Sequence, residues 1–272
     1  MPPAEPLLRA RALSKQYVQR RAFSATKYAV TAFEDVTLDL YRGETLALVG
    51  ESGAGKSTLA RCLALLETPT AGNIEMHGEQ VLRFDNRSLA PLRRHIQLIF
   101  QDPASALNPG LTACEIVAEP LVVQQIGSKA EQGDRALHLM EQVGLDAAQG
   151  RKRPFEFSGG QRQRLAVARA LALNPSVLVL DEALSNLDAR NQDLLLNLLG
   201  DLQTSHDLGY LFVAHDLALV SRFADRIAVM YQGRIVELRE TRELFAKPNH
   251  AYTQGLLYGL QSVDQILLQR SA

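Results

Sequence analysis

Residues 50–57 carry the most specific chemical signal in the chain, because they read GESGAGKS and fit the phosphate-binding pattern G-x-x-x-x-G-K-[ST]. An apolar stretch at 45–49 precedes the motif and a helical pattern follows it, which is the strand–turn–helix setting that the motif requires. We expect Lys56 to reach the β- and γ-phosphates of a nucleoside triphosphate and the Ser57 hydroxyl to ligate Mg²⁺. The alternative is a glycine-rich turn with a solvated lysine, and the setting opposes it.

Two carboxylates follow a second apolar stretch, at 177–180. Ligands bind at the carboxyl ends of strands in open α/β sheets, so Asp181 is placed to hold Mg²⁺ and Glu182 to polarise an attacking water. His215 ends the next apolar stretch, at 211–214, and is placed to contact the γ-phosphate. Taken alone, an acidic pair is often a solvated strand end or a helix cap, and a lone histidine is usually structural. The phosphate motif favours the catalytic interpretation.

Residues 157–164 read FSGGQRQR and resemble the signature motif of ABC ATPases. Ser158 and the amides of Gly159 and Gly160 begin a helix and form a second anion site, although a plain helix N-cap is the alternative. The resemblance implies that two ATPase domains pair head-to-tail, with each ATP between the phosphate loop of one domain and the signature of the other. In that family His215 corresponds to the switch histidine.

Three further positions resemble ABC motifs. Gln101 resembles the glutamine that senses Mg²⁺ and couples to the membrane subunits, and Asp188 ends a segment similar to the D-loop, which reaches across the dimer. Tyr17 resembles the aromatic residue that stacks on adenine; Phe23 and Tyr28 compete with it for that role. The residues expected to act in catalysis are Glu182, His215 and Gln101. Those expected to bind the nucleotide are Tyr17, Gly50, Ser52, Gly53, Gly55, Lys56, Ser57, Thr58, Ser158, Gly159, Gly160, Gln161 and Asp188. The expected metal ligands are Ser57, Gln101 and Asp181, and the expected cofactors are ATP and Mg²⁺.

Two stretches resemble the peptide and nickel importers of the ABC family. Residues 101–109 read QDPASALNP, and residues 233–238 (GRIVEL) lead to HAYT at 250–253, as in oligopeptide and dipeptide importers. The resemblance implies uptake of di- or oligopeptides; nickel or metal-chelate import is the alternative, which the DEALSNLD stretch at 181–188 favours slightly. The implied partners are two permease subunits, an extracytoplasmic substrate-binding protein and a second ATPase subunit, either a distinct sister or a copy of this chain.

Composition excludes several other classes. The 272 residues hold 29 Lys and Arg against 30 Asp and Glu, a net charge of −1 that gives no reason to expect a nucleic-acid partner. A soluble ABC protein acting on nucleic acid or ribosomes is the alternative, but such chains typically contain two ABC units or a long coiled-coil insertion, and this sequence shows neither of these, nor a basic stripe or a heptad run. The signature motif opposes a P-loop kinase. No apolar run approaches the roughly 20 residues of a membrane span, and the first residues lack a signal-peptide core. We expect a peripheral protein at the cytoplasmic face of the inner or plasma membrane.

The expected fold class is α/β, a P-loop NTPase core of the ABC ATPase type with an N-terminal antiparallel β part and an inserted α-helical signature subdomain. One nucleotide-binding domain is predicted over 1–272: core and β part at about 7–100 and 175–240, helical subdomain at about 102–172, and a family-specific tail at about 241–272. The predicted strands cover 7–13, 36–40, 45–49, 96–100, 177–180, 210–214, 226–230 and 234–238. Helices are predicted from Ser57, at 161–173 and at 190–202, with a helical stretch at 112–143 that Gly127 and Gly133 punctuate, and with a loop at 18–28.

Overall fold

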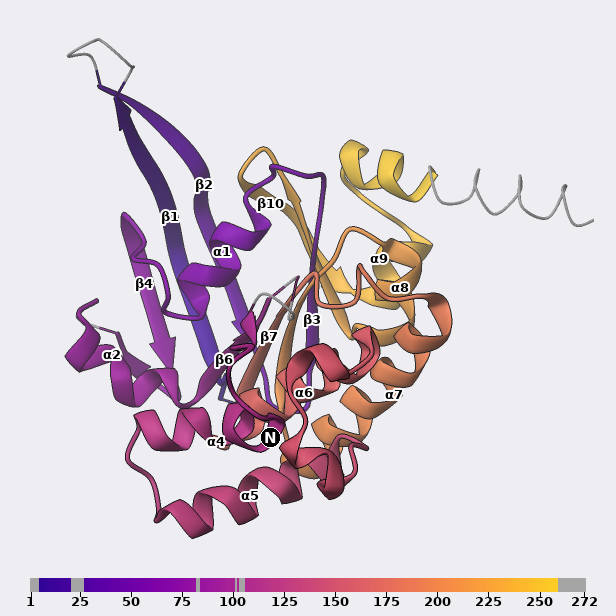
Figure 1. Cartoon of the computed structure of the whole chain (residues 1–272). Coiled ribbons are helices and arrows are strands. Elements are labelled where there is room, and N and C mark those ends of the chain that lie inside the picture. Colours follow the sequence, from indigo (N-terminus) through magenta and orange to yellow (C-terminus); the bar gives the residue numbers. More distant parts are fainter. Residues whose placement is uncertain (1–4, 21–26, 82–83, 101, 103–105, 259–272) are drawn as a thin grey trace, which may run out of the picture. The chain divides into compact units, whose positions relative to one another are not determined.

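The computed structural model describes residues 5–20, 27–81, 84–100, 102 and 106–258. The chain divides into two compact units, many of whose helices and strands are labelled in Figure 1. The first contains Met1–Phe84 and Gly209–Ala272, and the second contains Asp85–Leu208. The two units are therefore built from a chain that leaves the first unit once and returns to it.

An antiparallel sheet opens the first unit, in the order β2 (Lys27–Leu40), β1 (Leu8–Arg20), β4 (Ala71–Met76), β5 (Glu79–Gln80). The predicted loop at 18–28 is wrong at both ends, because β1 and β2 remain paired as far as Arg20 and Lys27. Val18 is 68% exposed, so this position lacks the burial by which an apolar strand residue is usually recognised. The predicted antiparallel β part is present, and its two long strands exceed their predicted bounds.

A second set of strands in the first unit is ordered β10 (Arg234–Glu240), β9 (Arg226–Tyr231), β3 (Thr45–Val49), β8 (Gly209–Val213). Strand β3 is parallel to both β8 and β9, whereas β10 is antiparallel to β9. Every residue of β3 and β8 is buried, which explains why both read as uninterrupted apolar runs. The helices of this unit include α1 (Lys56–Leu63), α8 (Leu217–Phe223) and α9 (Thr241–Ala246), and residues 251–258 are also helical.

The second unit pairs β6 (Ile96–Ile99) in parallel with β7 (Val177–Asp181). Its helices are α2 (Asn86–Arg93), α4 (Ala113–Val123), α5 (Lys129–Gln142), α6 (Gly159–Leu171) and α7 (Ala189–His206), with 3-10 turns at Ala147–Arg151 and Pro154–Glu156. Gly127 separates α4 from α5 as predicted, but Gly133 lies within α5 and interrupts nothing. Reciprocal Ser128–Glu131 capping starts α5 and offsets the weak helix propensity of this glycine.

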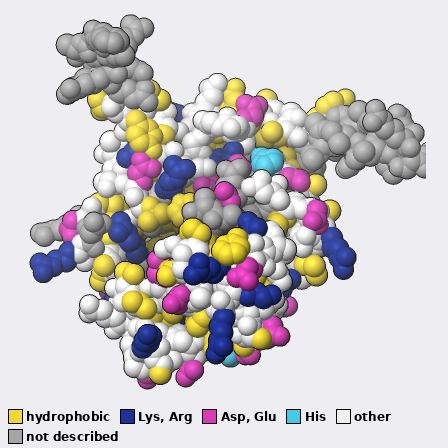
Figure 2. All heavy atoms as spheres, viewed as in Figure 1, with side chains coloured by type: hydrophobic (Ala, Val, Ile, Leu, Met, Phe, Trp, Pro, Cys, Tyr) yellow, Lys and Arg dark blue, Asp and Glu magenta, His cyan; other side chains and the backbone are white. Residues whose placement is uncertain are grey.

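Among the described residues, none of the helices combines the length and apolar composition needed to cross a membrane. On the face drawn in Figure 2, basic and acidic side chains are interspersed, in keeping with the balanced composition.

Candidate functional site

The glycine-rich loop joins β3 to α1 and has room only for glycine at two of its positions. Gly50 has φ +149° and Gly55 has φ +99°. A Cβ on Gly50 would lie 2.1 Å from the Met230 carbonyl oxygen, and one on Gly55 would lie 2.2 Å from the Ala32 carbonyl oxygen. The loop is therefore held against two neighbouring strands by backbone contacts that any larger residue would break.

Lys56 is the first residue of α1 and is only 5% exposed. Its Nζ donates to the carbonyl oxygens of Gly50 at 2.6 Å and of Glu51 at 2.8 Å, so the ammonium group lies inside the loop. The N-cap residue, Gly55, offers no side chain to the helix, and the first turn contains no acidic residue. The first-turn amides and the lysine thus present positive charge without a competing carboxylate on the helix, which fits a phosphate group.

The other predicted residues of the loop and the first helical turn differ in exposure. Ser52 and Gly53 are exposed, while Ser57 and Thr58 are half-buried in the first turn of α1. Strands β3 and β8 are parallel, so His215, two residues past the end of β8, leaves the sheet at the same edge as the loop. His215 is exposed. The first unit thus brings the phosphate loop and the predicted switch histidine to one edge.

Tyr17 lies in β1 beside the helix that follows the loop. Its hydroxyl donates to Glu67, and the ammonium of Lys15 lies 4.9 Å from the ring centre and 3.3 Å from the Glu67 carboxylate. Burial raises the pKa of the Tyr17 hydroxyl and Glu67 raises it further, whereas a hydrogen bond with Thr58 opposes the rise. The contact with Thr58 brings Tyr17 to the predicted phosphate site; Phe23 and the side chain of Tyr28 lie outside the described part of the chain.

The predicted acids lie in the second unit. Asp181 ends the fully buried β7 and is 5% exposed, and Glu182 follows it with φ +50°, a left-handed conformation that is uncommon for a side chain of this size. The Glu182 carbonyl accepts from the amide of Ser185 at 3.1 Å and from its hydroxyl at 2.9 Å. The strand therefore turns sharply after Asp181, and this turn fixes the direction in which the backbone carries Glu182.

Strand β6 lies beside β7, with Ile99 opposite Leu180, so both strands end at the same edge. Gln101 comes two residues after Ile99 and lies outside the described residues. The predicted magnesium ligands divide between the units, since Ser57 belongs to the first and Asp181 to the second. Hydroxyl and carboxylate oxygens are the ligand types that Mg²⁺ prefers.

The signature motif begins α6 with a capping box. The Ser158 side chain accepts from the Gln161 amide at 3.3 Å, and the Gln161 side chain accepts from the Ser158 amide at 3.0 Å. Ser158 is thus the N-cap of α6, as the alternative interpretation predicted. A serine hydroxyl that accepts one bond still has its own proton to donate, so capping leaves Ser158 able to bind an anion with the Gly159 and Gly160 amides.

Asp188 caps α7, where its carboxylate accepts from the Asn191 amide at 2.9 Å and the Asn191 side chain at 2.7 Å. These bonds, first among them the one from the Asn191 backbone, lower the pKa of Asp188. A Cβ on Gly160 would lie 3.0 Å from Asn191 Oδ1, so the same asparagine touches the signature helix. The sequence interpretation missed Asn191, which joins the signature to the predicted D-loop within one chain.

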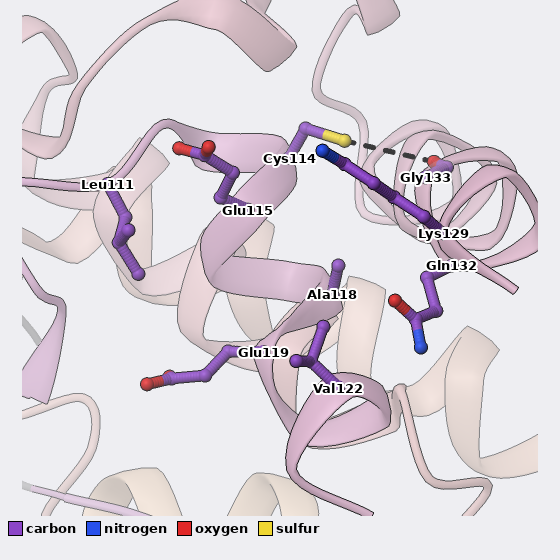
Figure 3. Close-up of a pocket in the computed structure, with 9 residues that line it drawn as sticks. All are labelled: Leu111, Cys114, Glu115, Ala118, Glu119, Val122, Lys129, Gln132 and Gly133. Carbon is purple, nitrogen blue, oxygen red and sulfur yellow. Dashed lines mark hydrogen bonds between the residues drawn. The ribbon is translucent and has the colours of Figure 1, made fainter. Parts of the chain in front are cut away.

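One hollow in the second unit holds none of the predicted site residues. It measures about 360 Å³ and lies between α4 and α5 (Figure 3). The Cys114 thiol, whose pKa is raised by burial, donates to the Gly133 carbonyl oxygen at 3.8 Å across this hollow. The lining residues are Leu111, Cys114, Glu115, Ala118, Glu119, Val122, Lys129, Gln132 and Gly133.

Comparison with known proteins agrees with the motifs. The family described as ABC transporter matches residues 33–185. The chain is 45% identical to a probable peptide ABC transporter ATP-binding protein, y4tS, of Sinorhizobium fredii, covering 93% of this chain and 72% of that one. It is 43% identical to the dipeptide transport ATP-binding protein DppF of Escherichia coli, covering 93% of this chain and 76% of that one. Against the glutathione import ATP-binding protein GsiA of Pectobacterium atrosepticum it is 42% identical over 98% of its own length, but it spans only 43% of that relative.

A solved structure confirms the predicted fold class. The ATP-binding cassette MJ0796, in a dimeric post-hydrolysis state bound to ADP and phosphate, superposes with a TM-score of 0.76 at 29% identity. The match covers 86% of this chain and 99% of MJ0796. The family match, the relatives and this fold agree with the phosphate loop and signature motif, and the chain therefore belongs to the ABC transporter family, within which it is an ABC ATPase.

Proposed function

We propose that this chain binds and hydrolyses MgATP to energise an importer of di- or oligopeptides. The observation that carries the nucleotide part is the buried Lys56 ammonium, enclosed by a loop in which Gly50 and Gly55 leave no room for a side chain. The peptide part rests on the relatives, two of which are named for peptide or dipeptide transport. The HAYT segment at 250–253 and the QDPASALNP segment at 101–109 support the same assignment.

Each site residue has a part in this proposal. Lys56 moves from its loop carbonyls to the β- and γ-phosphates, joined by amides of the loop, while Ser57 and Asp181 hold Mg²⁺ together with Gln101. Glu182 orients the attacking water and His215 contacts the γ-phosphate. Tyr17 stacks on adenine. The ion neutralises charge on the phosphates, and the chain's own residues position the reacting groups.

A second ATPase domain completes the proposed site. Ser158, Gly159, Gly160 and Gln161 of one domain bind the ATP held by the phosphate loop of the other, and Asp188 reaches across the pair. The dimeric form of MJ0796 supports this arrangement for the present chain. ATP binds the closed pair more tightly than the open one, and this difference in affinity supplies the free energy for moving the permeases.

The proposed partners are two permease subunits, a substrate-binding protein outside the membrane and a second ATPase subunit, at the cytoplasmic face of the membrane. The test is purification through a tag on this chain in mild detergent, with mass spectrometry of the bound proteins and ligand. Recovery of permeases and a binding protein loaded with peptide supports the proposal. A bound nickel or metal chelate moves the cargo to metal import, and the absence of any membrane partner contradicts transport.

Glu182→Gln tests the assignment of the base. The variant keeps the size and polarity of the side chain but removes its charge, so we expect ATP binding to persist while turnover falls about 10²- to 10⁴-fold. Lys56→Ala is the contrasting variant, because it should weaken nucleotide binding itself. Sustained wild-type hydrolysis by the glutamine variant contradicts the role given to Glu182.

A further inference from the structure

The segment after β10 is attached to that strand through a buried carboxylate. Glu237 is 7% exposed and accepts from the amides of Asn249 at 2.9 Å and His250 at 3.1 Å. Burial alone would raise the pKa of Glu237, but these amides, with smaller contributions from Thr253 and Arg239, bring it below its ordinary value. Residues 247–258, called the tail from here on and part of the segment predicted at about 241–272, are therefore attached to β10 just before the helix at 251–258.

Tyr252 extends from this anchor to the phosphate loop. Its ring stacks on that of Tyr231, with centroids 4.2 Å apart and planes at 28°, and its hydroxyl oxygen accepts from the Glu51 amide at 2.9 Å. The amide of Tyr252 itself donates to His250 Nδ1 at 3.1 Å. The ring is thus held by a stacked neighbour and the local backbone, which leaves the hydroxyl in a defined place over the loop.

Tyr252 and Lys56 bind the two ends of the same peptide group. The Glu51 N–H and the Gly50 C=O belong to one peptide unit; Tyr252 binds the first, and the Lys56 ammonium binds the second at 2.6 Å. Hydrogen bonds at the two ends of a peptide group polarise each other and are mutually strengthened. The tail therefore acts on the lysine through a single rigid peptide.

The neighbouring strand leaves this peptide little freedom on its other side. Gly50 approaches the Met230 carbonyl so closely that a Cβ would lie 2.1 Å from it, and the next residue, Tyr231, carries the ring on which Tyr252 stacks. Strand β9 and the tail together fix the first peptide of the loop from two directions. All of these contacts lie within the first unit.

We propose that Tyr252 is a positioning residue for nucleotide binding. By fixing the Gly50–Glu51 peptide it keeps the loop in one conformation and sets the resting place from which Lys56 moves to the phosphates. Loss of the hydroxyl leaves the exposed Glu51 amide to water and removes one of the contacts that fix this peptide, so part of the ordering of the loop becomes a cost of binding nucleotide. This inference concerns the loop and holds whatever cargo is transported.

The test is Tyr252→Phe, which removes the hydroxyl and keeps the stacked ring. Its matched control is Tyr231→Phe, which removes the hydroxyl of the other stacked ring, whose partner is Gln232 rather than the loop. Binding of a fluorescent ADP to the purified full chain gives the dissociation constant, and ATPase kinetics give KM and kcat. Thermal unfolding without nucleotide shows whether each variant folds.

For Tyr252→Phe we expect a dissociation constant about two- to twelvefold higher, the range that one hydrogen bond supplies, with KM raised and kcat unchanged. Tyr231→Phe should stay within twofold of the unmodified chain. Equal or tighter binding by Tyr252→Phe overturns the proposal, as does an equal loss in both variants, since that would make the tail a support for packing alone.

Discussion

The backbone conformation of Glu182 offers a test of strain in which two variants that both lose activity are expected to differ in stability. It follows the fully buried β7 with φ +50°, and its carbonyl closes a turn with Ser185. A residue with a Cβ in this conformation is strained by roughly 1–2 kcal/mol, whereas glycine adopts it freely. The comparison of Glu182→Gly with Glu182→Ala isolates this strain, because both variants lose the same carboxylate.

The expected size follows from two opposing terms. Relief of strain favours the glycine variant by about 1–2 kcal/mol, and the greater freedom of glycine in the unfolded chain opposes it by about 0.4–1 kcal/mol. The glycine variant should therefore be the more stable by about 1 kcal/mol, equivalent to a Tm about 2–4 °C higher. Both variants lack the proposed base, so both should lose ATP turnover.

Thermal unfolding of the two variants, followed by circular dichroism without nucleotide, measures the difference. In an unstrained helix or strand position, glycine is less stabilising than alanine by about 0.5–1 kcal/mol. A higher Tm for Glu182→Gly than for Glu182→Ala therefore indicates strain at this position. A Glu182→Gly variant that melts below Glu182→Ala refutes the argument that the turn after β7 is strained.

Three other expectations concern the loop, a helix and the tail. Gly55→Ala should weaken ADP binding far more than Gly53→Ala. Both glycines have positive φ, but only at Gly55 would the new Cβ meet a backbone atom, 2.2 Å from the Ala32 carbonyl oxygen. Binding of fluorescent ADP to the two variants measures the difference. Gly133→Ala should raise stability by about 0.5–1 kcal/mol, since Gly133 lies inside α5 with open space around it, and a lower Tm would contradict this. The pKa of Glu237 is lowered on folding, so the ionised side chain stabilises the fold at any pH above the ordinary carboxyl pKa of about 4.3. This stabilisation is lost as the pH falls through the lower pKa of the folded state. The Tm gap between the unmodified chain and Glu237→Gln should therefore hold from pH 8 to about pH 5 and narrow on further acidification, whereas a constant gap would contradict it.

The parts of the site that sequence predicted are those whose geometry is local. The phosphate loop needs glycines at fixed positions and a lysine at the start of a helix, and all of these lie within residues 50–57. Strands β3, β7 and β8 are fully buried, so their apolar runs marked them within one or two residues. Short-range sequence therefore located, in each unit, the strand ends that the proposed site residues follow.

Features that depend on exposed or distant neighbours escaped prediction. Val18 in the β1–β2 hairpin is exposed, and Gly133 lies within a helix although glycine usually interrupts one. The contact of Tyr252 with the loop joins residues 201 positions apart, and nothing within HAYT indicates which backbone group the tyrosine hydroxyl meets. Such contacts follow from the packing of the tail on β9 and β10, which a local pattern does not encode.

The signature and D-loop residues show why a structural role does not argue against a functional one. The Ser158 hydroxyl oxygen accepts one hydrogen bond, from the Gln161 amide, and the Asp188 carboxylate accepts two hydrogen bonds from Asn191. A serine hydroxyl keeps its proton, and an ionised carboxylate has about four acceptor positions, so both residues retain hydrogen-bonding capacity after capping. The caps also fix the rotamers of these side chains before any ligand arrives, which lowers the entropy lost on binding. In the proposed dimer, therefore, the bonds that begin α6 and α7 would also preorganise the groups that face the second ATPase domain.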